Sequence, residues 1–443
     1  MDTKLGLSKS AELYERAKYT LPGGVSRNTV LRDPHPLYAA HASGCHVIDL
    51  EGVERIDFAN NMASLIHGHA HPEITRAVTA QLAKGTAFTL ATEVEVDYAE
   101  YLVSRNPAFD KIRFVNSGTE AVMAAIKCAR AFTGRPKLAK VEGAYHGVYD
   151  YAEVSQTSKP DQWGDVDGPA SVPVVHGTPQ SALDDVVVVP FNDVERTLAI
   201  LERHADELAC VLLDPMPHRV GLHPADAEYI EALREWCTAR GALLVLDEVV
   251  TFRSTYGGAQ EWYDVDPDLT AMGKGIGGGF PVGAIAGRAD VMDMLNPLAD
   301  ELLFPHSGTF SANPVTMTAG LTAMRLYDQS AVDRVNDLAA RAMTGIRRSI
   351  RETGVPVCVT GGGSMFRVHF KPEPPRNYRE AFATVEENRR LKYMLDHLFA
   401  SGFMMINTCS ATISTPMGEP EIDALVAAFD HGFRELAAEA HHA

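Results

Sequence analysis

Hydrophobic positions between about residues 110 and 290 fall into short runs that alternate with longer amphipathic stretches. The runs rich in Val, Ile and Leu predict buried strands at IRFV (112–115), KLAKV (137–141), CVLLD (210–214) and ALLVLD (242–247). Helical patterns cover 119–132, 193–207 and 226–240. This alternation predicts an α/β fold with a mostly parallel sheet, whose ligands bind at the carboxyl ends of the strands.

Two regions depart from this pattern. Residues 155–185 are rich in Gly, Pro, Asp and Ser and are too long for a plain connection, so we expect either disorder or a cover over an active site. After residue 314, short strands near 356–370 and 403–415 interrupt long helical patterns, which predicts a smaller α+β unit. The helices expected there are 314–328, 331–353, 379–401 and 419–438. CHVIDL (45–50) is a strand candidate near the other chain end.

Composition narrows the function classes. A hydrophobic content of 46% and a charged content of 22% are typical of a soluble globular protein, and the net charge of -18 argues against nucleic-acid and anionic-membrane partners. The first twenty residues lack the apolar region of a signal peptide, and no apolar run is long enough to span a bilayer. Six cysteines without a C-x-x-C pair favour reduced thiols in a cytoplasmic protein.

Lys274 lies between glycines in TAMGKGIGGGFP (270–281), and the local pattern leaves several interpretations open. A Walker phosphate loop requires Ser or Thr after its lysine, whereas Gly275 follows here. A dinucleotide fingerprint opens a helix, whereas these glycines run into Pro281. A reactive amine fits better, because small neighbours leave room for an aldehyde cofactor. A surface lysine on a glycine hinge is the alternative.

Three further segments place chemistry at predicted strand ends. Asp247 ends ALLVLD and is either a buried carboxylate with a partner or an ordinary N-cap. After IRFV, Ser117, Gly118 and Thr119 precede a helix, which suits a phosphate pocket, a capping box with Glu120, or both together. The segments EGAYHGVYD (142–150) and KLAKV then place an aromatic ring at a third strand end.

Together these residues match what pyridoxal 5'-phosphate (PLP) requires of a protein. The cofactor needs a lysine for its aldehyde, a carboxylate for its pyridine nitrogen and a pocket for its phosphate, which Lys274, Asp247 and the 117–119 turn supply. Tyr145 is a candidate to cover the ring, although a loop tyrosine also serves plain packing.

The cluster His67, His69 and His71 in HGHAHPEI has spacing that resembles a metal site. We expect no metal there, because no supporting carboxylate shell is visible in the sequence.

Five motifs in order carry a resemblance to a known family: NSGTEA (116–121), AYHG (144–147), LDEVVTFR (246–253), TAMGKGIGGGFPVGA (270–284) and GTFSANP (308–314). The chain resembles the class III PLP-dependent aminotransferases, in particular the branch of glutamate-1-semialdehyde aminomutases and β-amino acid aminotransferases, from about Leu21 to the last helix. The resemblance implies PLP fold type I and a homodimer with active sites at the interface. It also implies an N-terminal segment (1–60) that packs with the small domain, a large PLP-binding domain (61–312) and a C-terminal small domain (313–443).

The resemblance assigns roles to matching positions. Lys274 forms the Schiff base and Asp247 pairs with the pyridinium. The remaining cofactor contacts are expected from Ser117, Gly118, Thr119, Tyr145, His146, Asp214 and Val249, with Thr309 reaching the phosphate bound by the neighbouring subunit.

LLDPMPHRVG (212–221) departs from the family pattern of Glu-Pro followed by Gln or Asn, whose amide contacts the ring hydroxyl. Asp214 replaces the glutamate, Pro217 stands where Gln is common, and Arg219 falls near the aminomutase asparagine. His218 or Arg219 is therefore expected to meet the ring hydroxyl, and Arg219 is also a candidate to contact the substrate.

The expected reaction is transfer of an amino group between an amino acid and a 2-oxo acid such as 2-oxoglutarate. PGGVSRNTVLRDPHPL (22–37) resembles the β-amino acid aminotransferases where an arginine meets the substrate carboxylate, so Arg27 favours a β-amino acid; a structural ion pair is the alternative. The late arginine that gates dicarboxylates in the family is missing from MMINTCSATIS (404–414). Other functions left open are an intramolecular aminomutase, a non-enzymatic PLP-binding protein and an anion-binding domain.

Overall fold

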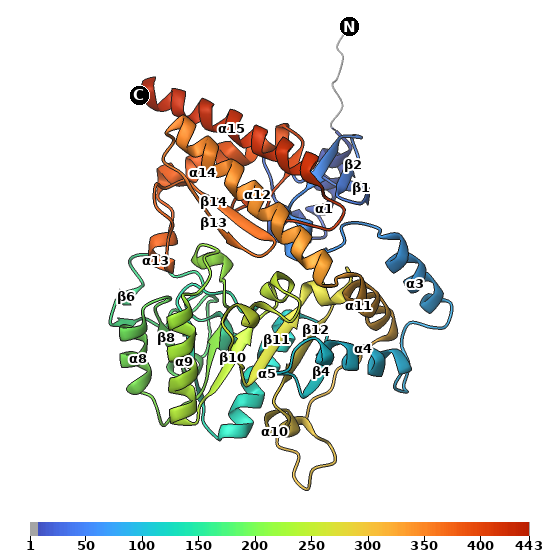
Figure 1. Ribbon diagram of the computed structural model, residues 1–443, viewed down its shortest axis with the longest axis vertical. Coiled ribbons are helices and arrows are strands. Elements are labelled where there is room, and N and C mark those ends of the chain that lie inside the picture. The colour runs from blue at the N-terminus through green and yellow to red at the C-terminus, as the bar shows by residue number, and fades with distance from the viewer. Residues whose placement is uncertain (1–7, 443) are drawn as a thin grey trace.

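A seven-stranded sheet forms the centre of the larger part of the molecule (Figure 1). The computed structural model describes residues 8–442. The strand order is β4-β12-β11-β10-β9-β5-β8, and only β12 runs antiparallel to its neighbours. The strands are β4 (Lys111–Val115), β5 (Lys137–Val141), β8 (Val186–Val189), β9 (Leu208–Leu213), β10 (Leu243–Asp247), β11 (Leu269–Gly273) and β12 (Gly283–Gly287). The predicted α/β fold with a mostly parallel sheet is confirmed.

Both faces of this sheet are buried, which explains its nearly continuous apolar strands. Alternate side chains of β10 enter different cores: Leu243 and Val245 pack beneath α5, whereas Leu244 and Leu246 pack with α9. The helices of this part are α3 (Pro72–Leu82), α4 (Glu93–Ser104), α5 (Gly118–Thr133), α8 (Val194–Glu202), α9 (Ala227–Arg240) and α11 (Pro314–Leu326). Shorter helices of this part are α6 (Asp150–Glu153), α7 (Gln180–Asp184) and α10 (Ala289–Met292), whereas α1 (Lys9–Ala17) lies against the N-terminal strands, where Ser10 donates hydrogen bonds to Glu51.

Strands β11 and β12 were not foreseen from the sequence. Their sequences, LTAMG and GAIAG, are rich in Ala and Gly, which have low β propensity. Small residues are needed at the ends of β12 because a Cβ on Gly283 would collide with the carbonyl of Ser117, and one on Gly287 with that of Asp268. Close packing against neighbouring segments therefore requires these small residues, although their intrinsic propensity for β-strands is low.

Segments from both chain ends form the smaller part of the molecule. One sheet has the order β1-β2-β3-β15 and joins the N-terminal strands to β15, which runs parallel to β3. The other has the order β13-β14-β16. The strands are β1 (Ala39–Ser43), β2 (His46–Asp49), β3 (Glu54–Asp57), β13 (Cys358–Gly362), β14 (Met365–His369), β15 (Phe403–Met404) and β16 (Ser410–Thr412). Helices α12 (Gln329–Thr353), α13 (Tyr378–Ala381), α14 (Val385–Ala400) and α15 (Glu419–His442) accompany them.

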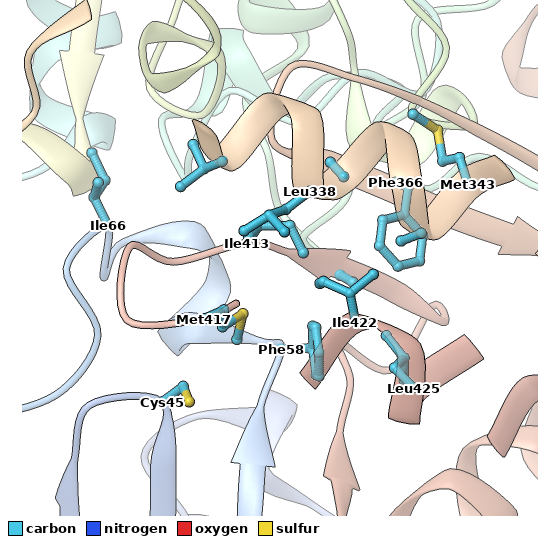
Figure 2. Close-up of a cluster of buried hydrophobic side chains, with 14 of the residues drawn as sticks. Cys45, Phe58, Ile66, Leu338, Met343, Phe366, Ile413, Met417, Ile422 and Leu425 are labelled. Atoms are coloured by element: carbon cyan, nitrogen blue, oxygen red, sulfur yellow. The ribbon is translucent and has the colours of Figure 1, made fainter. Parts of the chain in front are cut away.

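A shared core holds these distant segments together. Figure 2 shows Cys45, in the turn between β1 and β2, and Phe58, directly after β3, among C-terminal side chains that include Met417, Ile422 and Leu425. Phe58, Ile422 and Leu425 are fully buried. Burial of apolar surface between segments more than 350 positions apart in the chain therefore closes this part of the fold.

The single helix expected over 379–401 is two helices. The chain leaves α13 at Phe382 and starts α14 after Thr384. Thr384 accepts a hydrogen bond from the amide of Glu387, whose carboxylate accepts one from the amide of Thr384. This capping box satisfies free donors at the start of α14 and defines a new helix start.

Residues 155–185 are ordered and carry the short strands β6 (Gly164–Asp165) and β7 (Gly168–Pro169). They pack on α13: Trp163 lies edge-on to Tyr378, and Arg379 donates hydrogen bonds to the carboxylate of Glu142 and the carbonyl of Trp163. The expectation of disorder is therefore wrong, because aromatic and ionic contacts anchor the segment.

All six cysteines are buried and none forms a disulfide. Within residues 8–442, the helices lack any stretch both long and apolar enough to cross a membrane.

Candidate active site

Three ionisable side chains follow neighbouring strands of the large sheet. Asp214 follows β9, Asp247 ends β10 and Lys274 follows β11, and these strands are adjacent in the sheet. The register pairs Asp247 with Ala271, three positions before the lysine. The carboxyl ends of parallel strands meet at one edge, so the topology brings the predicted lysine and its acidic partners together.

Lys274 occupies a left-handed backbone position, with φ of 50°. Burial lowers the pKa of its amine, and the negative charges of Asp247 and Asp214 oppose that shift. A lysine whose neutral form is favoured by its surroundings is suited to nucleophilic and proton-transfer chemistry. The predicted reactive amine thus has the environment it needs.

Asp247 is buried and held from both sides. Its Oδ2 accepts a hydrogen bond from Nδ1 of His146 at 2.7 Å, and its Oδ1 accepts one from the amide of Val249 at 3.0 Å. Burial lowers the pKa of His146, which favours the neutral imidazole with its proton on Nδ1. Nε2 of His146 is a buried atom with no partner among the described residues. His146 was expected near the cofactor, but its pairing with Asp247, 101 positions away, has no signature in the sequence.

A fully buried lysine fixes the loop that carries Tyr145 and His146. Nζ of Lys140 donates hydrogen bonds to the carbonyls of Val141, Ala144 and Val154 at 3.3, 3.2 and 2.7 Å. These bonds tie the end of β5 to the residue after α6. Lys140 therefore acts on the site through the position of the loop.

The predicted phosphate turn lies at the N-terminus of α5. Oγ of Ser117 accepts a hydrogen bond from the amide of Glu120 at 3.1 Å, and the carboxylate of Glu120 accepts one from the amide of Asn116 at 2.8 Å. The capping interpretation is thus correct in part, with Glu120 reaching one residue further back than a capping box requires. The hydroxyl protons of Ser117 and Thr119 and the helix N-terminus remain suited to an anion.

Glycines let the segments of the site approach one another closely. A Cβ on Gly118 would lie 2.8 Å from Val249, and one on Gly273 would lie 3.2 Å from the same side chain. Gly147 has φ of 96°, and a Cβ there would lie 2.5 Å from Oγ1 of Thr119. Glycines from three separate segments therefore allow close packing against Val249 and Thr119.

Tyr145 is 44% exposed, and the Arg219 guanidinium lies over its ring at 5.1 Å. Arg219 also donates a hydrogen bond to the carbonyl of Gln156 at 3.2 Å. One face of the tyrosine thus has a cationic neighbour. Arg219 therefore lies beside the predicted ring cover, and its contact with the ring hydroxyl or the substrate stays a prediction.

Asp214 is buried, and burial and the charge of Asp247 raise its pKa well above the ordinary value. Its Oδ1 accepts a hydrogen bond from the amide of Met216 at 2.9 Å. A protonated carboxyl is a hydrogen-bond donor, so Asp214 can donate to an acceptor at the strand ends.

Arg27 and Thr309 are both exposed. Arg27 donates a hydrogen bond to Oδ1 of Asn61 at 2.6 Å, and the ion-pair alternative finds no partner for it among the described residues. Asn61 belongs to α2 (Asn60–Ala63), whose four residues all have φ between 45° and 69° and form a left-handed turn. The buried Asn60 anchors this turn by donating to the carbonyl of Thr412.

The three histidines of HGHAHPEI hold a turn. His67 contacts Oγ1 of Thr415 and the carbonyl of Ala323, and burial lowers its pKa to about 4. His69 contacts the carboxylate of Asp57 at 2.8 Å. The ring nitrogens of His67 and His69 therefore bind partners from several elements, whereas Nδ1 of His71 is buried without a partner among the described residues.

Comparison with known proteins agrees with this geometry. The model of the aminotransferase class-III family matches residues 29–415. The glutamate-1-semialdehyde 2,1-aminomutase of Methanothermobacter thermautotrophicus is 39% identical over 374 residues, 84% of this chain and 86% of that protein. An omega-transaminase from Sphaerobacter thermophilus has a TM-score of 0.94 at 48% identity, covering 97% and 98% of the two chains. A beta-phenylalanine aminotransferase from Variovorax paradoxus has a TM-score of 0.86 at 31% identity, covering 95% and 93%.

The chain therefore belongs to the class III aminotransferase family. It is a PLP-dependent aminotransferase, and PLP is its cofactor. The residues present fit this cofactor: the buried Asp247, held by His146, suits the pyridine nitrogen, and the N-terminus of α5 suits the phosphate. The amine of Lys274 completes the set.

Proposed function

We propose that the protein transfers an amino group from an amino acid, with a β-amino acid favoured, to a 2-oxo acid acceptor such as 2-oxoglutarate. The observation that carries this proposal is the meeting of Lys274 with Asp214 and the Asp247–His146 pair at the strand ends. Both substrates are small molecules, in keeping with the family.

Each residue has a defined task in this proposal. Bound PLP supplies an electron sink for the pair released when a substrate C–H bond breaks. The carboxylate of Asp247 keeps a proton on the pyridine nitrogen, and His146 keeps that carboxylate oriented. The neutral amine of Lys274 takes the proton from the substrate carbon and holds it for transfer to a second carbon. Ser117, Gly118 and Thr119 bind the phosphate, while Tyr145 and Val249 enclose the ring.

The choice of substrate rests on Arg27. Its guanidinium has an amide partner in Asn61 but no carboxylate partner within the described part of the chain, so it can bind a substrate carboxylate. The likeness to a protein named beta-phenylalanine aminotransferase supports this choice. The relatives named glutamate-1-semialdehyde 2,1-aminomutase favour the second candidate, an intramolecular exchange.

Dependence on an added acceptor distinguishes the two candidates. We expect product from 3-aminobutanoate only when a 2-oxo acid is present, because transamination needs a second substrate. Product from glutamate-1-semialdehyde alone, together with no activity on any amino donor and acceptor pair, would instead establish the aminomutase. Lys274→Ala is the control: it should abolish turnover and the visible absorbance of the holoenzyme.

We also propose a homodimer in the cytoplasm, in which Thr309 of one chain reaches the phosphate bound by its partner. Thr309 is exposed in the single chain, next to the exposed Phe310. The six unpaired, buried cysteines fit a reducing compartment.

A further inference from the structure

The sheet β13-β14-β16 has a polar face that packs on the turn after β9. Thr360, Arg367 and Ser410 are direct partners across the three strands, so their side chains share this face. The face contacts η3 (His218–Val220) and the following glycine: Arg367 donates a hydrogen bond to the carbonyl of His218 at 2.9 Å, and Thr360 donates one to the carbonyl of Gly221 at 2.7 Å. The C-terminal strands therefore reach the turn that follows Asp214.

Arg367 lacks an anionic partner. It forms no ion pair within the described residues, and the bond to His218 is its one hydrogen bond there. Its Nε is buried and has no acceptor. Burial lowers its pKa to about 10, and the acidic groups that oppose this shift are the thiols of Cys409 and Cys358, whose own pKa values are raised to about 12. Because those thiols are neutral at physiological pH, no negative charge compensates the guanidinium.

Two arginines that are more deeply buried have more acceptors than Arg367, although neither forms an ion pair within the described residues. Arg253 donates to the hydroxyl of Ser364 and to the carbonyls of Ala63 and Ile413. Arg105 donates to three backbone carbonyls, and its Nη2 is a buried atom without a partner. Arg367 has five N–H donors and one acceptor, so it has the fewest acceptors of the three.

The ring of His218 contacts the C-terminal strands that carry Arg367. Its Nε2 contacts Oγ1 of Thr408 and Oγ of Ser410 at 3.0 and 3.1 Å. Burial and the positive charges of Arg367 and Lys274 lower its pKa to about 3, so both cations act on this imidazole. Arg367 is partly buried, and its Nε is a buried donor without an acceptor among the described residues. A guanidinium with unused donors can bind an anion from outside the described part of the chain.

We propose that Arg367, positioned by the carbonyl of His218, binds a carboxylate of a substrate. This inference rests on the proposed transamination. The planar guanidinium presents paired donors that match a carboxylate, and Arg27 offers a second cation on a different element. The carboxylate can belong to the amino donor or to the far end of the oxo-acid acceptor, and Thr408 and Ser410 supply hydroxyls beside it.

Two matched substrate pairs distinguish these sources. In Arg367→Met, we expect KM to rise about tenfold or more for the substrate whose carboxylate is bound. The donor pair is 3-aminobutanoate against 2-aminobutane, and the acceptor pair is 2-oxoglutarate against 2-oxopentanoate. If KM rises only for 3-aminobutanoate, Arg367 binds the carboxylate of the donor. If KM rises only for 2-oxoglutarate, Arg367 binds the carboxylate of the acceptor. Arg55→Met is the control, because Arg55 is partly buried but pairs with Asp49 away from the site.

Binding of glutarate to the holoenzyme gives a readout that needs no turnover. We expect calorimetry to detect glutarate binding in the wild type and in Arg55→Met. The affinity for glutarate should fall about tenfold or more in Arg367→Met and should recover in part in Arg367→Lys. Equal glutarate affinity in wild type and Arg367→Met, or an equal rise in KM for both members of each pair, overturns the proposal. If Arg367→Met does not fold, Arg367→Lys decides: an unchanged affinity and an unchanged KM overturn the proposal. Lost glutarate binding without transamination of any donor rejects the proposed function but keeps the anion site.

Discussion

Single residues of the site work by burial and by fixed partners. Lys274 and Asp247 were identifiable from the sequence because their motifs are local, and Asp247 also ends a predicted strand. The contact between His146 and Asp247 was not, because it joins the ends of two strands that are separated by β9 in the sheet. Arg367 was missed for the same reason: its lack of a partner is a property of the folded surroundings.

Glu248, next to Asp247, gives a pH-dependent prediction. It is fully buried, accepts hydrogen bonds from the amides of Ala259 and Gln260, and burial raises its pKa to about 7. Between the ordinary pKa of a glutamate and about 7, the folded state holds a proton that the unfolded state has released. Stability from this group is therefore fully present at low pH and is lost as the pH rises through about 7.

The variant Glu248→Gln should remove this dependence. We expect the free energy of unfolding, measured by urea denaturation between about pH 5 and pH 8, to fall less steeply in the variant than in the wild type. The difference is up to about 3 kcal/mol over this range. Glu228→Gln, at an exposed position of α9, is the control. Parallel pH profiles for wild type and Glu248→Gln would contradict the prediction.

At the level of elements, glycines decide how closely the site segments approach one another. The sequence predicted the helix that begins near residue 118 and the strands before and after it, because their hydrophobic patterns are strong. It did not predict β11 and β12, whose small residues answer to tertiary contacts. The break before α14 was readable in principle from Thr384 and Glu387, three positions apart.

Gly147→Ala should disturb the phosphate turn. The new methyl group would lie 2.5 Å from Oγ1 of Thr119, at a backbone φ of 96°. We expect a loss of roughly 2–4 kcal/mol in the free energy of unfolding and weaker PLP binding, measured by urea denaturation and spectroscopic titration.

Gly134→Ala is the control that separates the steric contact of the new methyl group from the cost of placing alanine at a positive φ. Gly134 caps α5 with φ of 69°, and a Cβ there meets nothing within 4 Å. We expect a cost of about 1 kcal/mol and unchanged PLP affinity. Equal effects of the two substitutions would show that backbone conformation alone matters at Gly147.

On the scale of the whole molecule, exposed apolar side chains gather in the segment that follows α10. Leu298 is 90% exposed, Phe310 is 59% exposed, and Leu302 and Leu303 lie between them. Part of this segment projects from the body below α10 (Figure 1). Exposed apolar residues concentrated in this way are typical of a protein–protein interface. In the dimer proposed from the family resemblance, the partner chain would cover this surface.

Phe310→Asp should therefore weaken the dimer. We expect light scattering after gel filtration to give a dimer for the wild type and a monomer for the variant at micromolar concentration, because a charge would be buried in the interface. Val385→Asp is the control, since Val385 is 89% exposed at the start of α14. A wild-type monomer, or a dimer that Phe310→Asp leaves intact, would contradict the prediction.

The backbone of residues 60–63 winds in the left-handed sense, although all four residues are L-amino acids. L-residues resist this winding by about 1–2 kcal/mol each, whereas D-residues favour it. If Met62 were replaced by its mirror-image isomer through chemical ligation, the chain would follow the same path with less resistance. Asn61 would still face Arg27, so a gain in stability without loss of that contact would measure how much free energy the native stereochemistry stores beside the arginine that we propose binds substrate.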